Sequence, residues 1–547
     1  MHQLSPSGHA DTFARDQLPP LPQWPVMDPV PHRDLPALQY PERLNCATEL
    51  LRTVDDRPCL RGGDGTVWSY AEVATRTDRL AAALTEDFGL VPGNRVLLRG
   101  PNSPQLAVAW LAVLKAGGVA VTTMPLLRPG ELRTTIDTAR VTLALCHRAH
   151  LDDLLAVDAA GLRVVAYGGE DAELESRAAA HAGPFPAADT AADDVALIAF
   201  TSGTSGRPKA TMHLHRDVLA IADTFAAHVL RPRAGDVFAG SPPLAFTFGL
   251  GGLLVFPLRA GASTLLLERA TPDELFRAVG RHGVTVLFTA PTAYRAALPR
   301  LAEYDLRTLR RCVSAGEALP ATTWHAFHDA TGVRIIDGIG ATEMLHIFIS
   351  AADDDIRPGS TGRPVPGYEA RIVDDEGRPV PDGQPGRLAV RGPTGCRYLD
   401  DPRQASYVQD GWNLTGDTYV RDAEGYFWYQ ARSDDMIVSS GYNIAAPEVE
   451  EALLRHPLVA ECAVVGAPDP RRGTIVKAYV VLASRPRPEA ALVEELQNFV
   501  KQEIAPYKYP RAVEFVAALP RTQTGKLQRS LLPERMPSRL LTTLQPS

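Results

Sequence analysis

Short apolar runs alternate with longer amphipathic stretches along most of the chain. Between residues 95 and 168 the apolar runs read RVLLRG, VAVTTM, TLALC and LRVVAYG, and the helical pattern QLAVAWLAVLKAGG separates the first two. A second block, residues 194–340, repeats this rhythm, and its apolar runs end in Gly, Ser, Thr or Asp. The alternation predicts parallel sheets covered by helices, whose ligands bind at the carboxyl ends of the strands.

The pattern changes twice towards the C-terminus. From about residue 360 to 430, the runs ARIVDDEGRPV, GRLAVRG and GYFWYQAR contain Asp-Glu-Gly and Ala-Glu-Gly turns, which predict antiparallel hairpins. From about residue 435, stretches such as PEVEEALLRHP and IVKAYVVLA predict a small α+β unit. The predicted fold class is α/β, with a large N-terminal domain of two doubly wound sheets and a small β-barrel portion, and a small α+β C-terminal domain.

Length and charge narrow the picture further. The chain has 547 residues, enough for two to four domains. Residues 1–40 are Pro-rich and aperiodic, which predicts an extended arm that wraps a domain or a disordered leader. Lys and Arg number 56 against 64 Asp and Glu, a net charge of −8 without a basic block. This balance argues against nucleic acid as the main partner.

Cysteine usage and hydropathy indicate the compartment. Six cysteines are scattered along the chain, with no CxxC pair and no His at metal-ligand spacing: Cys46, Cys59, Cys146, Cys312, Cys396 and Cys462. They fit reduced, mostly buried thiols. No run approaches the roughly 20 apolar residues of a membrane span, and no basic and then apolar leader opens the chain. We therefore expect a cytoplasmic protein without a membrane partner.

The segment TSGTSGRPKA, residues 201–210, has the composition of a phosphate-binding loop. It follows the apolar run VALIAF and offers four hydroxyls, Gly203, Gly206, and the cations Arg207 and Lys209. The spacing fits neither the GxxxxGK of a P-loop nor the GxGxxG of a kinase. A solvated linker would not directly follow a buried strand. A loop that holds the β- and γ-phosphates of ATP and then releases pyrophosphate fits these residues.

This segment resembles the signature loop of the adenylate-forming superfamily, which includes acyl- and aryl-CoA ligases, adenylation domains of peptide synthetases and beetle luciferases. Further family motifs follow in the expected order: SAGEALP from Ser314, GIGATE ending at Glu343, TGD at residues 415–417, RSDDMIVSSGYNI from Arg432, and PRTQTGKLQR around Lys526. The resemblance extends over about residues 42–535. It implies that a carboxylate attacks the α-phosphate of ATP to give acyl-AMP and pyrophosphate, and that a thiol then displaces AMP.

The resemblance also implies roles for individual residues. Lys526 would reach the substrate carboxylate and the α-phosphate, Glu343 would hold Mg²⁺, and Thr342 would touch the phosphate. Asp417 and Arg432 would bind the ribose. The full set expected to bind ATP or AMP is Thr201, Ser202, Gly203, Thr204, Ser205, Gly206, Lys209, Gly316, Glu317, Ala318, Asp337, Gly338, Ile339, Gly340, Ala341, Asp417 and Arg432.

By the same resemblance, residues 41–432 form the adenylation domain and residues 433–547 a mobile C-terminal domain. Asp434 occupies the hinge position, where rotation would replace Lys526 with a different face of the C-terminal domain. Gly441 would then line the CoA tunnel. Ser440 precedes it where relatives usually have Gly or Ala, and its extra bulk could weaken thioester formation.

The acid pocket is expected around the segments PPLAFTFGLGG, FTAPTAYR and GIGATEMLHIF. Its predicted residues are Phe246, Thr247, Phe248, Gly249, Ala290 and His346, with Gly316 and Ile339 beside them. Many family members have His at the position of Phe246, so this chain departs towards an apolar wall. Such a set favours an aromatic or bulky apolar acid with one polar contact. Several segments, among them GATEMLHIFIS and GRLAVRGPTGCRYL, are most similar to 2-aminobenzoate and benzoate CoA ligases.

The leading hypothesis is an acid:CoA ligase that uses ATP, Mg²⁺ and CoA. The first alternative is an acid-adenylating enzyme of secondary metabolism that passes a polycyclic or medium-chain acid to a carrier protein or a separate thiolation partner. The second is a catalytically silent binding module, although the retained Lys526, Glu343 and Asp417 argue against it. The expected assembly is a monomer or homodimer.

Overall fold

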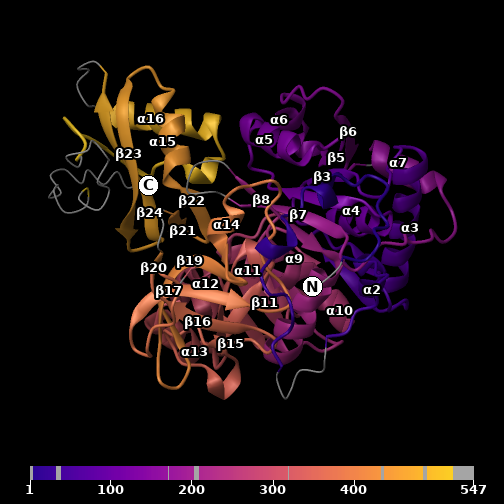
Figure 1. The fold of residues 1–547 in the computed structure, drawn as a ribbon, viewed down its shortest axis with the longest axis horizontal. Coiled ribbons are helices and arrows are strands. Elements are labelled where there is room, and N and C mark those ends of the chain that lie inside the picture. The colour runs from indigo at the N-terminus through magenta and orange to yellow at the C-terminus, as the bar shows by residue number, and fades with distance from the viewer. Residues whose placement is uncertain are drawn as a thin grey trace. The chain divides into compact units, whose positions relative to one another are not determined.

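The computed structural model describes residues 4–31, 38–169, 172–201, 208–317, 319–432, 436–483, 490–520 and 532. These residues form two compact units, a larger one within residues 1–434 and a smaller one within residues 435–547 (Figure 1). The larger unit contains three sheets and the smaller unit a three-stranded sheet and a hairpin.

The first sheet of the larger unit has six strands in the order β6-β5-β3-β4-β7-β8. Its strands are β3 (Arg95–Arg99), β4 (Val119–Thr123), β5 (Leu143–His147), β6 (Arg163–Tyr167), β7 (Val195–Thr201) and β8 (Lys209–Leu214). All neighbours are parallel except β7 and β8, which are antiparallel. The helices α3 (Tyr70–Glu86), α4 (Pro104–Lys115) and α5 (Pro129–Ala139) join these strands or precede them. Helix α3 begins at a capping box in which Ser69 and Glu72 satisfy each other's backbone amides.

The second sheet has nine strands in the order β15-β14-β13-β12-β11-β9-β10-β1-β2. Those nearest the predicted site are β9 (Val237–Gly240), β11 (Val286–Thr289), β12 (Arg311–Ser314), β13 (Ile335–Gly340) and β14 (Ile347–Ser350). The helices α11 (Pro272–His282), α12 (Pro291–Ala297) and α13 (Ala321–Thr331) alternate with these strands. Strands β9, β11, β12 and β13 are parallel. The residues after β11, β12 and β13 therefore lie at one edge of the sheet.

The run HRDVLAIADTFAAHVL forms a helix of two kinds. It begins as α8 (His215–Ile221) and continues as a π-helix, η3 (Ala222–Leu230). A second π-helix, η4 (Gly251–Val255), follows α9 (Thr247–Leu250) and leads into α10 (Phe256–Ala260). The hydrophobic pattern predicts a helix here and does not distinguish the π form, which is recognised by its i to i+5 hydrogen bonds.

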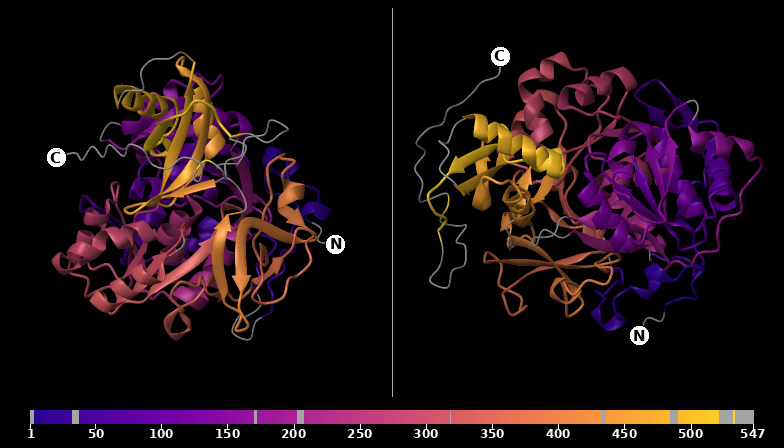
Figure 2. Two further views of the ribbon diagram at one scale, coloured as in Figure 1. Left: turned by 90° about the vertical axis from the view of Figure 1, so that its left-hand side faces the viewer. Right: turned by 90° about the horizontal axis from the view of Figure 1, so that it is seen from above.

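The third sheet is antiparallel and curled (Figure 2). It contains β16 (Glu369–Val373), β17 (Pro385–Arg391), β18 (Val408–Gln409), β19 (Trp412–Arg421) and β20 (Phe427–Arg432). The Ala-Glu-Gly turn connects β19 to β20, where Gly425 adopts φ of 84°. Two large α/β sheets, this curled sheet and the small C-terminal unit confirm the predicted fold class.

Residues 4–31, here called the N-terminal strap, pack along the larger unit. The strap has one turn of helix, α1 (Phe13–Asp16), and one 3₁₀ turn, η1 (Leu21–Gln23). Its buried residues Ala14, Trp24 and Met27 join the hydrophobic core of the six-stranded sheet. Near its end, the Val26 backbone amide donates a hydrogen bond to Gly411 of the curled sheet, and the strap lies beside that sheet in Figure 2.

The smaller unit begins with a hairpin of β21 (Met436–Ser439) and β22 (Tyr442–Ala445). Its two-residue turn is Ser440 and Gly441, whose φ angles are 51° and 80°. Both positions are left-handed, a conformation that Gly adopts freely and Ser adopts at a cost. The other elements of this unit are α15 (Ala446–Leu454), β23 (Val459–Asp469), β24 (Gly473–Leu482), α16 (Ala490–Glu503) and β25 (Ala512–Phe515).

All six cysteines lie in described parts of the chain, and all are buried and free. Among the described helices, none has both the length and the apolar character that crossing a membrane requires.

Candidate active site

Some of the predicted site residues lie outside the described residues. They are Ser202, Gly203, Thr204, Ser205, Gly206, Ala318, Asp434 and Lys526. Arg432 is described by its backbone, which pairs with Asp417 across β19 and β20. Thr201 ends β7 and pairs with Lys209 at the start of β8, so the described ends of the phosphate loop lie side by side.

Glu343 and Lys209 meet at one tyrosine. Glu343 lies in the 3₁₀ turn η6 (Thr342–Met344) just after β13, and its side chain is buried. The Tyr398 hydroxyl donates a 2.5 Å hydrogen bond to Glu343 Oε1, and Lys209 Nζ lies 5.5 Å from the centre of the Tyr398 ring. Burial, together with the Glu343 charge, raises the pKa of Tyr398, so the tyrosine keeps its proton as a donor.

Strand β8 fixes the position of Tyr398. On one edge β8 pairs with β7, and on the other the Met212 amide donates to the Arg397 carbonyl while the Leu399 amide donates to the Ala210 carbonyl, both at 2.8 Å. The strand that begins with Lys209 therefore also places the tyrosine that bonds Glu343. This arrangement brings two predicted phosphate-site residues together from distant parts of the chain.

A buried polar cluster supports the Glu343 turn from beneath. His213 Nε2 lies 2.8 Å from the Thr342 carbonyl oxygen, and because a carbonyl only accepts, Nε2 carries the hydrogen. Burial and the nearby Arg397 guanidinium lower the pKa of His213 to about 3, so the imidazole is neutral. Arg397 forms an ion pair with Asp217, and neither side chain is exposed. These residues hold the backbone that carries Thr342 and Glu343.

The segment expected to contact adenine lies at the carboxyl ends of β12 and β13. The Thr292 hydroxyl donates a 2.6 Å hydrogen bond to Glu317 Oε2, and Gly316 before it adopts φ of 91°. A Cβ atom at Gly338 would lie 2.7 Å from Ile347, and one at Gly340 would lie 2.8 Å from the His346 carbonyl. Both glycines are therefore required by close packing. Ile339 and Ala341 alongside them are half-buried.

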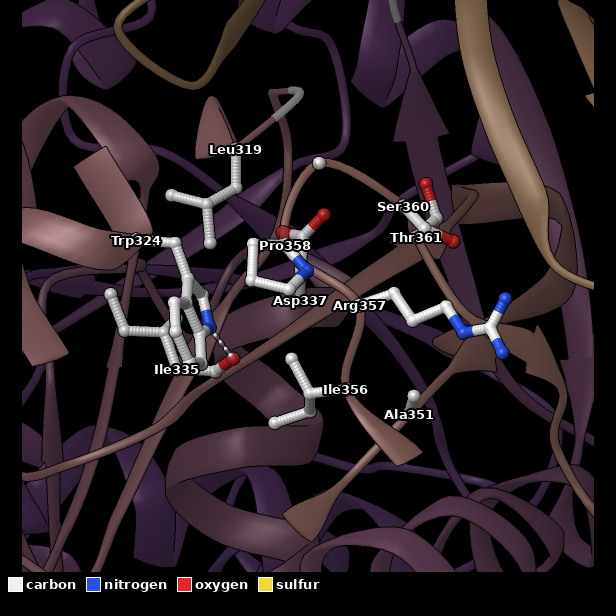
Figure 3. Close-up of a pocket in the computed structure, with 11 residues that line it drawn as sticks. Leu319, Trp324, Ile335, Asp337, Ala351, Ile356, Arg357, Pro358, Ser360 and Thr361 are labelled. Carbon is white, nitrogen blue, oxygen red and sulfur yellow. Dashed lines mark hydrogen bonds between the residues drawn. The ribbon is translucent and has the colours of Figure 1, made fainter. Parts of the chain in front are cut away.

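Asp337 lines a small pocket beside this segment (Figure 3). Leu319, Trp324 and Pro358 surround it, and the Trp324 indole donates to the Ile335 carbonyl at 2.9 Å. Apolar surroundings raise the pKa of Asp337 to about 8, although the Ser314 hydroxyl and neighbouring backbone amides oppose the shift. The carboxyl group is thus mostly protonated near neutral pH and can both donate and accept a hydrogen bond.

Two of the predicted acid-pocket residues, Phe248 and His346, lie in a cluster of aromatic rings. Phe246 precedes α9, while Thr247, Phe248 and Gly249 lie within it, and Ala290 precedes α12. The Phe248 ring centre lies 5.5 Å from that of Phe288 and 5.7 Å from that of His346. A Cβ atom at Gly249 would lie 2.1 Å from the Pro243 carbonyl, which excludes any larger residue there.

His346 is the one polar ring in this cluster. It is 3% exposed, and its ring centre lies 4.6 Å from that of Phe256 and 5.4 Å from that of Phe225. Neither ring nitrogen has a hydrogen-bond partner among the described residues. Burial lowers the pKa of His346 to about 3, and the Phe248 backbone opposes this shift without meeting hydrogen-bond geometry. The neutral ring has one donor and one acceptor nitrogen, and Nε2 packs against Gly251 of η4, where an added Cβ atom would lie 2.8 Å from it.

Comparison with known proteins identifies the family. Residues 48–397 match the family described as AMP-binding enzyme, and residues 448–526 match the AMP-binding enzyme C-terminal domain. The chain belongs to the AMP-binding enzymes. The predicted resemblance to acyl- and aryl-CoA ligases of the adenylate-forming superfamily is thereby confirmed.

Named relatives of this AMP-binding enzyme include ligases of aromatic acids. Benzoate–CoA ligase of Thauera aromatica is 37% identical over 519 residues, which cover 90% of this chain and 96% of that protein. The crystal structure of the anthranilate CoA ligase AuaEII in complex with anthranoyl-AMP is 35% identical, covering 91% of this chain and 98% of that one, with a TM-score of 0.71. The amide bond synthetase McbA from Marinactinospora thermotolerans is 28% identical, covering 89% and 98%, with a TM-score of 0.81.

The residues of this AMP-binding enzyme fit a magnesium ion shared with a nucleotide. Within the described residues, no group of three or more His, Cys, Asp or Glu side chains could hold a metal ion alone. Glu343 nevertheless presents a carboxylate beside Lys209. Mg²⁺ in nucleotide sites is typically held by one or two carboxylates, water and substrate phosphates, so one buried carboxylate at a phosphate loop suits it.

Four residues of the site were not predicted from the sequence: His213, Asp217, Arg397 and Tyr398. The alternation of polar and apolar residues in KATMHL places His213 on the polar face of a strand, with Lys209 and Thr211. This pattern predicts a solvent-facing side chain, whereas His213 is buried. The segment CRYL gives no local sign that its tyrosine reaches Glu343, 55 residues away in the sequence.

Proposed function

We propose that this AMP-binding enzyme activates an aromatic carboxylic acid as its acyl-AMP and transfers the acyl group to CoA. The observation that carries the proposal is that Lys209 and Glu343 both lie at Tyr398. An aromatic cluster surrounds His346, which follows Glu343 closely in the chain. A cation at one end of the phosphate loop and a carboxylate in the turn η6 suit ATP with Mg²⁺. The aromatic cluster suits the ring of the acid.

The proposed reaction has two balanced steps. The substrate carboxylate attacks the α-phosphorus of ATP, the bond to the β-phosphate oxygen breaks, and pyrophosphate leaves. A thiolate then attacks the acyl carbon, and AMP leaves. Lys209 would stabilise the charge that develops on the departing pyrophosphate, and Mg²⁺ held by Glu343 would neutralise the phosphates. Asp417, buried and opposite Arg432 in the sheet, would bind the ribose.

The acid is inferred from two properties of the pocket. Phe248 and Phe288 contribute apolar rings, and His346 contributes nitrogens without a partner among the described residues. Together they favour a planar ring that bears one polar substituent, as in the 2-aminobenzoates, over an aliphatic chain. The names of the related benzoate and anthranilate CoA ligases support this class.

The second candidate is an enzyme that adenylates the acid and delivers it to an acceptor other than CoA, such as a carrier-protein thiol. The observation that favours it is Ser440, a non-glycine residue in a left-handed turn at the position expected to line the CoA tunnel. The likeness to an amide bond synthetase is consistent with a different acceptor.

Pyrophosphate exchange with benzoate, 2-aminobenzoate, 2-hydroxybenzoate, medium-chain and polycyclic acids tests the first step. Exchange with the benzoates and CoA consumption at a comparable rate support the leading proposal. Exchange without CoA consumption supports the second candidate. Absence of exchange with every acid contradicts both.

Lys526 tests the proposed alternation of the two half-reactions. Lys526→Ala should abolish adenylation and leave thioester formation from synthetic acyl-AMP largely intact, whereas equal loss of both would contradict a hinge at Asp434. We further propose a cytoplasmic monomer or homodimer.

A further inference from the structure

The N-terminal strap covers a buried charge beneath the nucleotide site. The Trp24 ring lies over the Arg397 guanidinium, with its centre 5.1 Å from the guanidinium carbon, and Arg397 Nη1 donates to Met27 Sδ at 3.6 Å. Trp24 and Met27 are each 9% exposed, and the Arg397 side chain is fully buried. The strap thus forms part of the wall that keeps water away from the ion pair of Arg397 with Asp217.

The side chain of Gln404 bridges the strap and Tyr398. Gln404 Nε2 donates a 2.9 Å hydrogen bond to the Gln23 carbonyl of the strap. Gln404 Oε1 in turn accepts from the Tyr398 backbone amide, also at 2.9 Å. The Tyr398 hydroxyl then donates to Glu343. A chain of three hydrogen bonds therefore runs from the strap backbone to the carboxylate.

A second route reaches the same turn through the buried cluster. Arg397 pairs with Asp217, and both flank His213, which holds the Thr342 carbonyl. Both charges of this ion pair have been removed from water, so the pair depends on good geometry, and disturbing one partner of such a pair is strongly destabilising. Removal of the Trp24 ring would admit water to Arg397 and allow its backbone, which pairs with β8, to shift.

The opposite end of the strap is anchored independently. Asp11 pairs with Arg95 and accepts a 2.8 Å hydrogen bond from Asn94 Nδ2, and Arg15 pairs with Asp194 at 3.0 Å. No described contact of Asp11 involves Arg397, Tyr398 or the Glu343 turn. Asp11 therefore provides a matched control, because its loss loosens the strap at one end only.

We infer that the strap is a positioning element of the nucleotide site, in which Trp24 and Gln404 hold Tyr398 and Arg397 so that Glu343 is correctly placed. The inference rests on the proposed function for the role of Glu343 in binding Mg²⁺ and ATP. The coupling between the strap and the Glu343 turn does not depend on it.

The test compares full-length Trp24→Ala, Trp24→Phe and Asp11→Asn. The first readout is hydrogen–deuterium exchange of the backbone amides in residues 341–345 and 397–399, measured without ligand. Trp24→Ala should accelerate exchange in both segments, Trp24→Phe should largely restore protection because a ring still covers Arg397, and Asp11→Asn should accelerate exchange only around residues 4–16. Should Trp24→Ala fail to fold, Met27→Ala replaces it.

The second readout is pyrophosphate exchange. Trp24→Ala should lower kcat/KM for MgATP about tenfold and change KM for the acid less than twofold, with recovery in Trp24→Phe. Equal effects of Trp24→Ala and Asp11→Asn in both readouts, or faster amide exchange confined to the strap, would overturn the inference. Wild-type protein without exchange activity would contradict the proposed function alone, since amide exchange still decides the coupling.

Discussion

Two buried histidines, one beneath the Glu343 turn and one in the aromatic cluster, differ in whether their ring nitrogens have hydrogen-bond partners. His213, beneath the Glu343 turn, and His346, in the aromatic cluster, both have a pKa of about 3 because burial disfavours the charged ring. His213 bonds the Thr342 carbonyl at 2.8 Å, whereas neither nitrogen of His346 has a partner among the described residues.

We interpret His213 as part of a scaffold that supports the Glu343 turn, and His346 as part of a proposed binding site. An unpaired polar group in an apolar interior costs about 1–3 kcal/mol, so a protein retains one where another requirement outweighs the cost. On the nucleotide side, His213 Nε2, Arg397 and the Tyr398 hydroxyl have partners within the protein, whereas His213 Nδ1 and Asp217 Oδ1 have none among the described residues. Under the proposed function, the substrate would be the partner of a His346 nitrogen.

The largest expected effect comes from the scaffold side. Glu343→Gln removes the charge that would hold Mg²⁺ and keeps the size of the side chain. Pyrophosphate exchange should fall on the order of 100-fold or more, and raising the Mg²⁺ concentration should recover part of it. Tyr398→Phe is the graded comparison, with a loss of about tenfold because the carboxylate keeps its charge and loses its orientation. Retention of full activity in Glu343→Gln would remove Glu343 from the proposed mechanism.

The same substitution at both histidines tests the contrast directly. His213→Leu leaves the Thr342 carbonyl without its partner and should lower the free energy of unfolding by about 1–3 kcal/mol. His346→Leu breaks no described hydrogen bond and should change it by less than about 1 kcal/mol, or increase it. Urea denaturation of the two variants and the wild type measures both. Equal destabilisation would show that His346 also has a structural partner.

Much of the fold was predictable, because it follows from local pattern. Strands such as β3 and β7 are continuous apolar runs, and helix α3 carries its own capping box. The residues of the nucleotide site were predictable only through family motifs. The contacts between Tyr398 and Glu343 and between His213 and Thr342 join residues 55 and 129 positions apart, and no periodicity encodes such pairings.

The third expected effect concerns substrate choice. Wild-type protein should favour 2-aminobenzoate or 2-hydroxybenzoate over benzoate, because under the proposed function a polar substituent would pair with His346. In His346→Leu this preference in kcat/KM should fall about tenfold, mainly because kcat/KM for the two substituted acids decreases. Phe248→Leu alters the apolar wall alone, so it should lower kcat/KM for all three acids by a similar factor. An unchanged preference in His346→Leu would place the polar contact elsewhere.

The smallest expected effect is on acid stability. The unfolded chain protonates its histidines near pH 6.5, whereas burial lowers the pKa of His213, His215 and His346 to about 3 in the folded protein. The contribution of these neutral histidines to the free energy of unfolding is therefore fully present above pH 6.5 and declines as the pH falls below that value. Thermal unfolding between pH 7.5 and 5 should show this decline, and His346→Leu should make it shallower. An identical slope in the variant would mean that His346 accepts a proton in the folded state.

The two π-helical stretches have a consequence for how the acid pocket can diverge. Phe225 lies in η3, η4 runs directly into Phe256, and both rings contact His346. A π-turn reaches one residue further than an α-turn, so it corresponds to a single inserted residue that the surrounding helix has absorbed. Deleting one residue from 251–255 would restore α-helical phase and rotate Phe256 away from the histidine. If these rings line the proposed acid pocket, the number of residues in the helix would determine its width as well as the size of the side chains.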